Sequence, residues 1–135
     1  MPRFTKSKSR IEWRNAPDVK KRIIYLLGTL GITNFKTTRI ICFRSVNAHT
    51  RAYARIWGLG RVWQLALKVK PAYILEVISE KFDKLSDKDR DRVLLHEIAH
   101  IPMNFSGALA PHAHGKGRFH DKLKQYEHLF DTWRR

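Results

Sequence analysis

The five residues His96-Glu97-Ile98-Ala99-His100 constrain this 135-residue chain more than any other feature. On a helix, a spacing of four places both imidazoles on one face, where they can reach a single ion, and zinc accepts this geometry. Glu97 lies about 100° around the helix from His96, so its carboxylate leans over an open coordination position and can take a proton from metal-bound water. Chance placement in a chain of this composition gives roughly 0.01 such matches.

The residues around this motif predict the helix that it requires. Ser86 stands before Asp87-Lys88-Asp89, which is the pattern of an N-cap followed by carboxylates in the first turn. Pro102 stops the helix, because its ring removes a backbone donor and disfavours helix at the preceding residue. We therefore expect a helix from about Asp87 to Ile101.

Hydrophobic periodicity predicts the other elements and an α+β fold in a single domain over residues 1–135. The expected series is a basic arm or extended lead-in over 1–15, a helix over 17–30, a strand over 37–46, a turn over 47–51, an extended segment over 52–57, a segment of unclear type over 62–69, a strand over 72–79, the motif helix, and a C-terminal helix that carries Phe119, Leu123, Tyr126, Phe130 and Trp133.

A catalytic zinc site needs a third protein ligand and an open position for water. His112 and His114 lie in the Pro- and Gly-containing loop after the motif, where the chain can turn back over the ion. Spacing alone does not separate these two histidines. His120 and Glu127 are less favoured candidates, and His128 is expected to be an exposed residue of the last helix.

The net charge of +15 is unevenly distributed along the chain. Residues 1–35 carry +6, residues 36–70 carry +8 with no acidic side chain, residues 71–100 carry −2, and residues 101–135 carry +3. A basic first half predicts an anionic partner, of which nucleic acid is the commonest. The alternative is a solvated basic surface without a dedicated ligand.

Cysteine content and hydropathy indicate a cytoplasmic protein without a membrane partner. Cys42 is the single cysteine, so no intramolecular disulfide can form, and we expect an inert buried thiol. The uncharged run from Ile23 to Phe35 is 13 residues long and too short to span a bilayer. Trp57 and Trp63 lie in a basic stretch that suggests base stacking, but burial tendencies favour a place in the core.

Several further motifs accompany the histidine motif in a fixed order. They are Ala-Arg-Ile-Trp-Gly-Leu at 54–59, Tyr-Ile-Leu-Glu-Val at 73–77, Leu95 to Pro102, Phe-Ser-Gly at 105–107 and Pro-His at 111–112. In these residues, over roughly 35–115, the chain resembles the metallopeptidases of phages and archaea. That family is similar to small zincins, including the SprT-type zinc proteases.

The resemblance implies a minimal zincin-like fold, in which a short mixed sheet is flanked by about three helices, one of them the motif helix. It implies His96 and His100 as zinc ligands and Glu97 as general base. His112 matches the family's Pro-His, whereas His114 matches the His-Gly pattern of the SprT type. In such a fold the 72–79 strand would flank the cleft, and its exposed edge would pair with an extended peptide.

The expected function is hydrolysis of a peptide or protein substrate by a zinc-activated water, near nucleic acid. Glu97 would remove the proton and return it to the leaving amine. Arg118, His120 or Tyr126 would stabilise the oxyanion. Two other functions are consistent with the residues: a nucleic-acid-binding protein with a structural or vestigial zinc site, and a metal-dependent hydrolase that acts on a non-peptide bond.

Overall fold

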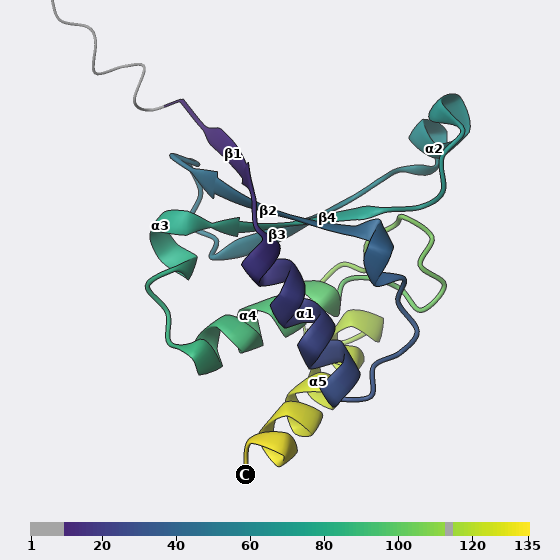
Figure 1. The fold of residues 1–135 in the computed structure, drawn as a ribbon. Coiled ribbons are helices and arrows are strands. Elements are labelled where there is room, and N and C mark those ends of the chain that lie inside the picture. The colour runs from purple at the N-terminus through teal and green to yellow at the C-terminus, as the bar shows by residue number, and fades with distance from the viewer. Residues whose placement is uncertain (1–9, 113–114) are drawn as a thin grey trace, which may run out of the picture.

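The computed structural model describes residues 10–112 and 115–135, and in them the chain is an α+β protein with one mixed sheet (Figure 1). The strands are β1 (Glu12–Asn15), β2 (Ile40–Val46), β3 (Ala54–Gly58) and β4 (Tyr73–Ile78), in the order β1-β2-β4-β3. β2 and β4 are parallel, whereas β1 pairs with β2, and β3 with β4, in antiparallel fashion. The predicted fold class is confirmed.

Five α-helices accompany the sheet in the described residues. They are α1 (Pro17–Thr29), α2 (Arg61–Leu67), α3 (Ser79–Phe82), α4 (Asp87–Ile98) and α5 (Arg118–Arg134), with a 3₁₀ turn at Thr37–Arg39. The three long helices, α1, α4 and α5, match the three that the periodicity predicts, and all lie on the same side of the sheet (Figure 1). The segment of unclear type is helix α2. No helix in the described ranges is both long and apolar enough to cross a membrane.

The structure makes one sequence-based expectation about strands more specific and shows that another is wrong. Residues 12–15 belong to β1, which pairs with β2, so this part of the predicted lead-in is ordered strand; residues 1–9 lie outside the described range. The 72–79 strand does not have an exposed edge, because β4 is bonded to β2 on one side and to β3 on the other. Its nearly continuous apolar sequence reflects burial on both faces. The edge strand beside it is β3.

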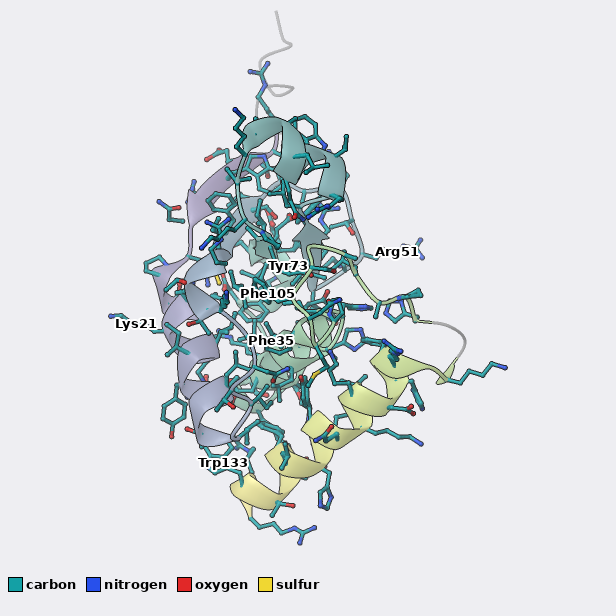
Figure 2. All side chains as sticks on the ribbon, turned by 90° about the vertical axis from the view of Figure 1, so that its right-hand side faces the viewer. Lys21, Phe35, Arg51, Tyr73, Phe105 and Trp133 are labelled. Atoms are coloured by element: carbon teal, nitrogen blue, oxygen red, sulfur yellow. The ribbon has the colours of Figure 1, made fainter. Side chains whose placement is uncertain are left out.

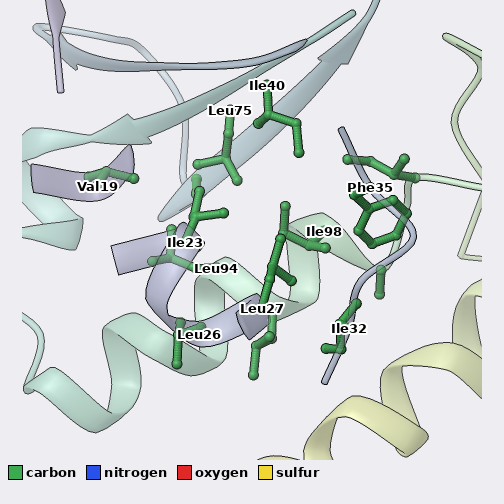
Figure 3. Close-up of a cluster of buried hydrophobic side chains, with 14 of the residues drawn as sticks. Val19, Ile23, Leu26, Leu27, Ile32, Phe35, Ile40, Leu75, Leu94 and Ile98 are labelled. Atoms are coloured by element: carbon green, nitrogen blue, oxygen red, sulfur yellow. The ribbon is translucent and has the colours of Figure 1, made fainter. Parts of the chain in front are cut away.

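The main core lies between the sheet and the helices. Ile23 of α1 and Leu94 and Ile98 of α4 pack beneath Ile40 and Leu75 of the two central strands (Figure 3). All five side chains are almost completely buried. Cys42 is buried as well, and burial raises the pKa of its thiol to about 11, as expected for an inert side chain.

The opposite face of the sheet carries a buried carboxylate, Glu76. Its side chain is fully buried and accepts hydrogen bonds from Ser45 Oγ at 2.5 Å, Arg55 Nε at 2.8 Å and Trp57 Nε1 at 2.9 Å. Burial alone would raise the pKa of Glu76, but these three donors outweigh it and the pKa lies below its ordinary value. The prediction that Trp57 and Trp63 belong to the core is wrong, since both are about half exposed.

We expect Glu76→Gln to destabilise the fold by about 2 kcal/mol at pH 7, because the amide replaces an acceptor that satisfies three donors. A carboxylate with a lowered folded pKa stabilises the protein above its unfolded pKa of about 4.3 and loses that effect as the pH falls through the folded value. Urea unfolding of wild type and variant should therefore differ by a constant amount above about pH 5 and converge in acid.

The matched control is Glu12→Gln on β1, whose carboxylate pairs with Arg14 in an exposed position. This change should cost little at any pH. Equal unfolding free energies of Glu76→Gln and wild type at pH 7 would contradict the stabilising role of Glu76.

Candidate metal centre

Helix α4 begins at Asp87, as its sequence predicts, but it ends at Ile98 rather than at about Ile101. Ser86 Oγ caps the helix by accepting a hydrogen bond from the backbone amide of Asp89 at 3.2 Å. The regular helix ends at Ile98, and the last turn tightens: His100 N donates to Glu97 O at 3.1 Å instead of to the residue four back. Pro102 forbids continuation of the helix, so His100 lies in this tightened turn. The ring centroids of His96 and His100 are 5.5 Å apart.

The loop after α4 is attached to the sheet through Tyr73 of β4. The phenolic oxygen of Tyr73 accepts a hydrogen bond from Gly107 N at 2.8 Å and donates to Ala108 O at 2.7 Å. Its ring also contacts Phe105, which in turn contacts Phe35, so three aromatic side chains hold the start of the loop (Figure 2). The central strand thereby determines where the loop runs.

The end of the same loop is attached to His100. Ala110 N donates to the backbone oxygen of His100 at 2.8 Å, and His100 Nδ1 lies 2.6 Å from Ala110 O. Because a carbonyl only accepts, Nδ1 carries the proton and Nε2 has a free lone pair. This arrangement orients the imidazole as a ligand and places His112 two residues beyond the point of attachment.

His96, His100 and His112 come together around one point. Each offers a ring nitrogen, and these three atoms lie within 4.8 Å of one another. The Nε2 atoms of His96 and His112 are 3.4 Å apart. Two nitrogens bound to one tetrahedral ion at 2.0–2.1 Å would be roughly 3.3 Å apart, so the observed spacing fits a shared metal ion.

The electrostatic environment favours neutral imidazoles and a protonatable carboxylate. Burial, together with the neighbouring His100 and His112, lowers the pKa of His96 to about 4. Burial also lowers the pKa of His100. Neutral imidazole is the form that binds metal, so the cluster is ready to bind metal at neutral pH. Burial raises the pKa of Glu97 to about 7.

Phe119, in the first turn of α5, forms the back wall of the cluster. Its ring stacks on His100 with centroids 4.0 Å apart and an interplanar angle of 11°. The same ring meets His96 at 5.1 Å and His112 at 4.8 Å in edge-to-face arrangements. The sequence marks Phe119 as an apolar residue of the last helix, but gives no sign that it contacts all three histidines.

A cleft of about 550 Å³ opens over the three histidines. One wall is β3 with the residues just before it, and the other is formed by α4 and α5. The lining residues are Ala52, Tyr53, Ala54, Arg55, Arg92, Val93, His96, Glu97, His100, His112 and Glu127. The histidine group and Glu97 therefore line the same cleft as β3, the edge strand of the sheet.

Residues 11–135 match the sequence model of a family described as putative phage metallopeptidase. The chain belongs to this family. The match extends well beyond residues 35–115, which contain the motifs that resemble this family, and it includes the whole of α5. No curated protein and no solved structure matches the chain.

The histidine group of this metallopeptidase-family chain contains one of the two favoured third ligands. His112 lies in the group, whereas His114 lies outside the described residues. Glu127 lines the cleft from α5 but is not part of the group, and neither is His120. His128 is exposed on α5, as predicted.

The expected oxyanion-stabilising residues do not lie in the cleft. Arg118 is exposed, Tyr126 is buried, and neither they nor His120 belong to the lining that the described residues form. Arg92 does line the cleft, where it also pairs with Asp131 at 2.9 Å. A sequence signal for Arg92 existed, because it precedes His96 by four residues and so shares the ligand face of α4.

We expect the zinc content of His96→Ala and of His112→Ala, after purification without added metal, to be lower than that of wild type by about tenfold or more. Each change removes one of the three ligands. His128→Ala is the matched control and should bind as wild type does. The measurement is metal per chain by elemental analysis, together with circular dichroism to confirm folding. Zinc contents equal to that of His128→Ala would show that the histidine group is not a metal site.

Proposed function

We propose that this protein is a zinc-dependent peptidase that hydrolyses peptide bonds with Glu97 as general base. The observation that carries the proposal is the arrangement of His96, His100 and His112 around one point, with Glu97 in the same cleft. Three protein ligands leave one coordination position open, which is the arrangement of catalytic sites. Membership of the metallopeptidase family supports the same reaction class.

The three histidines would hold the ion through ring nitrogens, a donor set that suits zinc. When bound, zinc supplies Lewis acidity that makes a water more acidic and a carbonyl more electrophilic. His100 is kept in the ligating tautomer by the Ala110 carbonyl, and Phe119 excludes water from the rear of the cluster. These contacts prepare the site before any metal binds.

Glu97 performs the proton transfers in this proposal. Its neighbour His96 is a ligand, and α4 directs the Glu97 carboxylate into the cleft. There it accepts a proton from the attacking water and donates it to the leaving amine, so that the carboxylate is restored at the end of the cycle. A partly buried carboxylate without a competing salt bridge among the described residues is suited to both steps.

The cleft wall favours an extended peptide as substrate over a non-peptide bond. β3 is bonded to β4 on one side only in the described sheet, and residues 52–55 line the cleft. An extended peptide can add to such an edge by backbone hydrogen bonding, which would carry its amide groups past the histidines. The edge belongs to β3, in place of the 72–79 strand that the sequence suggested.

The alternative of a nucleic-acid-binding protein with a structural zinc predicts a closed site with four protein ligands. The described residues contribute three, and Glu97 is not part of the histidine group. We therefore favour the peptidase. Association with nucleic acid through the basic first half stays a prediction, which salt-dependent binding would test.

We expect Glu97→Gln to reduce hydrolysis of an unfolded protein substrate by about 100-fold or more while zinc content stays at the wild-type level, because the amide cannot accept the proton. Glu127→Gln, which changes a carboxylate of the same cleft outside the histidine group, is the control and should retain most activity. Rates and zinc content are measured on the same preparations. Hydrolysis that survives in Glu97→Gln would exclude Glu97 as the base.

A further inference from the structure

Helix α2 has the reverse of the usual amphipathic arrangement. It stands away from the body of the protein at one end of the sheet (Figure 1). Gln64, its one buried side chain, is 4% exposed. The apolar side chains around it point outward, and we call them the apolar knob: Val62 (71% exposed), Trp63 (59%), Leu65 (62%), Leu67 (58%) and Val69 (42%).

The knob is firmly attached, so its exposure is a property of the fold. Gln64 Nε2 donates to Leu59 O at 2.7 Å and to Ser106 O at 2.8 Å, which joins α2 to the loop that leads to His112. Gly107 has φ of +96°, and a side chain there would collide with the Leu59 carbonyl oxygen. Polar contacts and close backbone packing thus hold α2 while its apolar side chains remain in water.

A cluster of exposed apolar side chains on a rigid element indicates an interaction surface. Exposed cations surround the knob: Arg61 at the start of α2, and Lys68 and Lys70 just after it. Residues 36–70 contain no acidic side chain at all. The partner must therefore combine an apolar interior with a negatively charged surface.

The shape and charge of the knob discriminate among such partners. At about 100° per residue, the arc from Leu65 through Val62 and Trp63 to Leu67 covers about 200° of the helix. A protein groove typically takes one narrower stripe, and stacking on single-stranded nucleic acid would use Trp63 and leave the aliphatic side chains in water. A second copy of the chain would bring Arg61 and Lys68 against like charges. A bilayer covers the whole arc.

We propose that the apolar knob inserts into the interfacial region of an anionic lipid bilayer. Trp63 takes the headgroup level that tryptophan prefers, the aliphatic side chains enter the acyl boundary, and Arg61, Lys68 and Lys70 contact lipid phosphates. This contact is peripheral, so it differs from the sequence-based expectation of no membrane partner, which considered only spanning segments. It does not depend on the metal centre.

The position of the knob relates it to the cleft. β3 runs from Ala54, which lines the cleft, to Gly58, which precedes α2. Five strand residues cover roughly 17 Å. A bilayer that holds the knob would therefore place the edge strand close to the membrane surface, where segments of membrane-bound proteins are accessible as extended substrates.

The first test uses the full chain and vesicles of phosphatidylcholine, alone or mixed in equal parts with phosphatidylglycerol. We expect co-sedimentation with the mixed vesicles at low salt, little with phosphatidylcholine alone, and weakening as salt rises. Leu65→Ser should weaken binding about tenfold. Ile24→Ser, at an exposed position of α1, is the matched control and should bind as wild type does.

The second test separates charge from apolar insertion. The double variant Arg61→Gln/Lys70→Gln removes two cations beside the knob and should weaken vesicle binding about fivefold for each charge removed. The control double variant, Lys21→Gln/Lys124→Gln, removes two cations at exposed sites on α1 and α5 and should have a smaller effect. Brominated lipids should quench tryptophan fluorescence in wild type and less in Trp63→Phe. Circular dichroism confirms that all variants are folded.

Several outcomes would overturn the proposal. One is absence of binding to the mixed vesicles at low salt, and another is equal binding of Leu65→Ser and Ile24→Ser. Loss of single-stranded DNA binding in Leu65→Ser, with no vesicle binding by wild type, would assign the knob to nucleic acid instead. Glu97→Gln should bind vesicles as wild type does, so failure of the peptidase proposal and failure of this one are distinguishable.

Discussion

The two-way hydrogen bonding between His100 and Ala110 is the interaction on which the site depends. One bond fixes the protonation of the His100 ring, and the other fixes the backbone that leads to His112. A loop between a helix and a third ligand loses considerable entropy on ordering. Here that ordering is achieved by contacts that exist without metal, so the cluster is largely preorganised.

The central strand β4 provides the framework for both sides of the molecule. On the helix side, Tyr73 holds the loop that ends at Ala110, and Leu75 packs in the core. On the other side, Glu76 gathers Ser45 of β2 and Arg55 and Trp57 of β3. One six-residue strand therefore links the sheet, the metal-site loop and the base of the knob.

The sequence reveals those parts of the site that depend on residues close together in the chain, but not those that depend on contacts between distant residues. His96, Glu97 and His100 are recognisable because four-residue spacing on a capped helix is a local property. The position of His112 depends on the contacts of Tyr73 with residues more than 30 positions away, so spacing left two histidines open. The same helical spacing predicts that Arg92 lies on the ligand face of α4, although Arg92 is not one of the expected ligands.

The fold shows the same division. Periodicity identified the three long helices and the most apolar strand, but the order of strands is set by non-local pairing, and an apolar run does not reveal which strand lies at an edge. The general tendency of tryptophan to be buried failed for Trp57 and Trp63. In Trp57 the indole N–H is satisfied by Glu76 while the ring faces water, and Trp63 belongs to a helix whose polar residue is the buried one.

The stacking of Phe119 on His100 joins the metal site to the folding of the C-terminal helix. Because α5 supplies this ring, the cluster reaches its full geometry only when α5 is docked. Ion binding and helix docking are then thermodynamically linked, and each increases the population of the other. A bound metal ion would therefore stabilise the docked α5. Without metal, the C-terminal helix would undock and unfold more readily than the sheet.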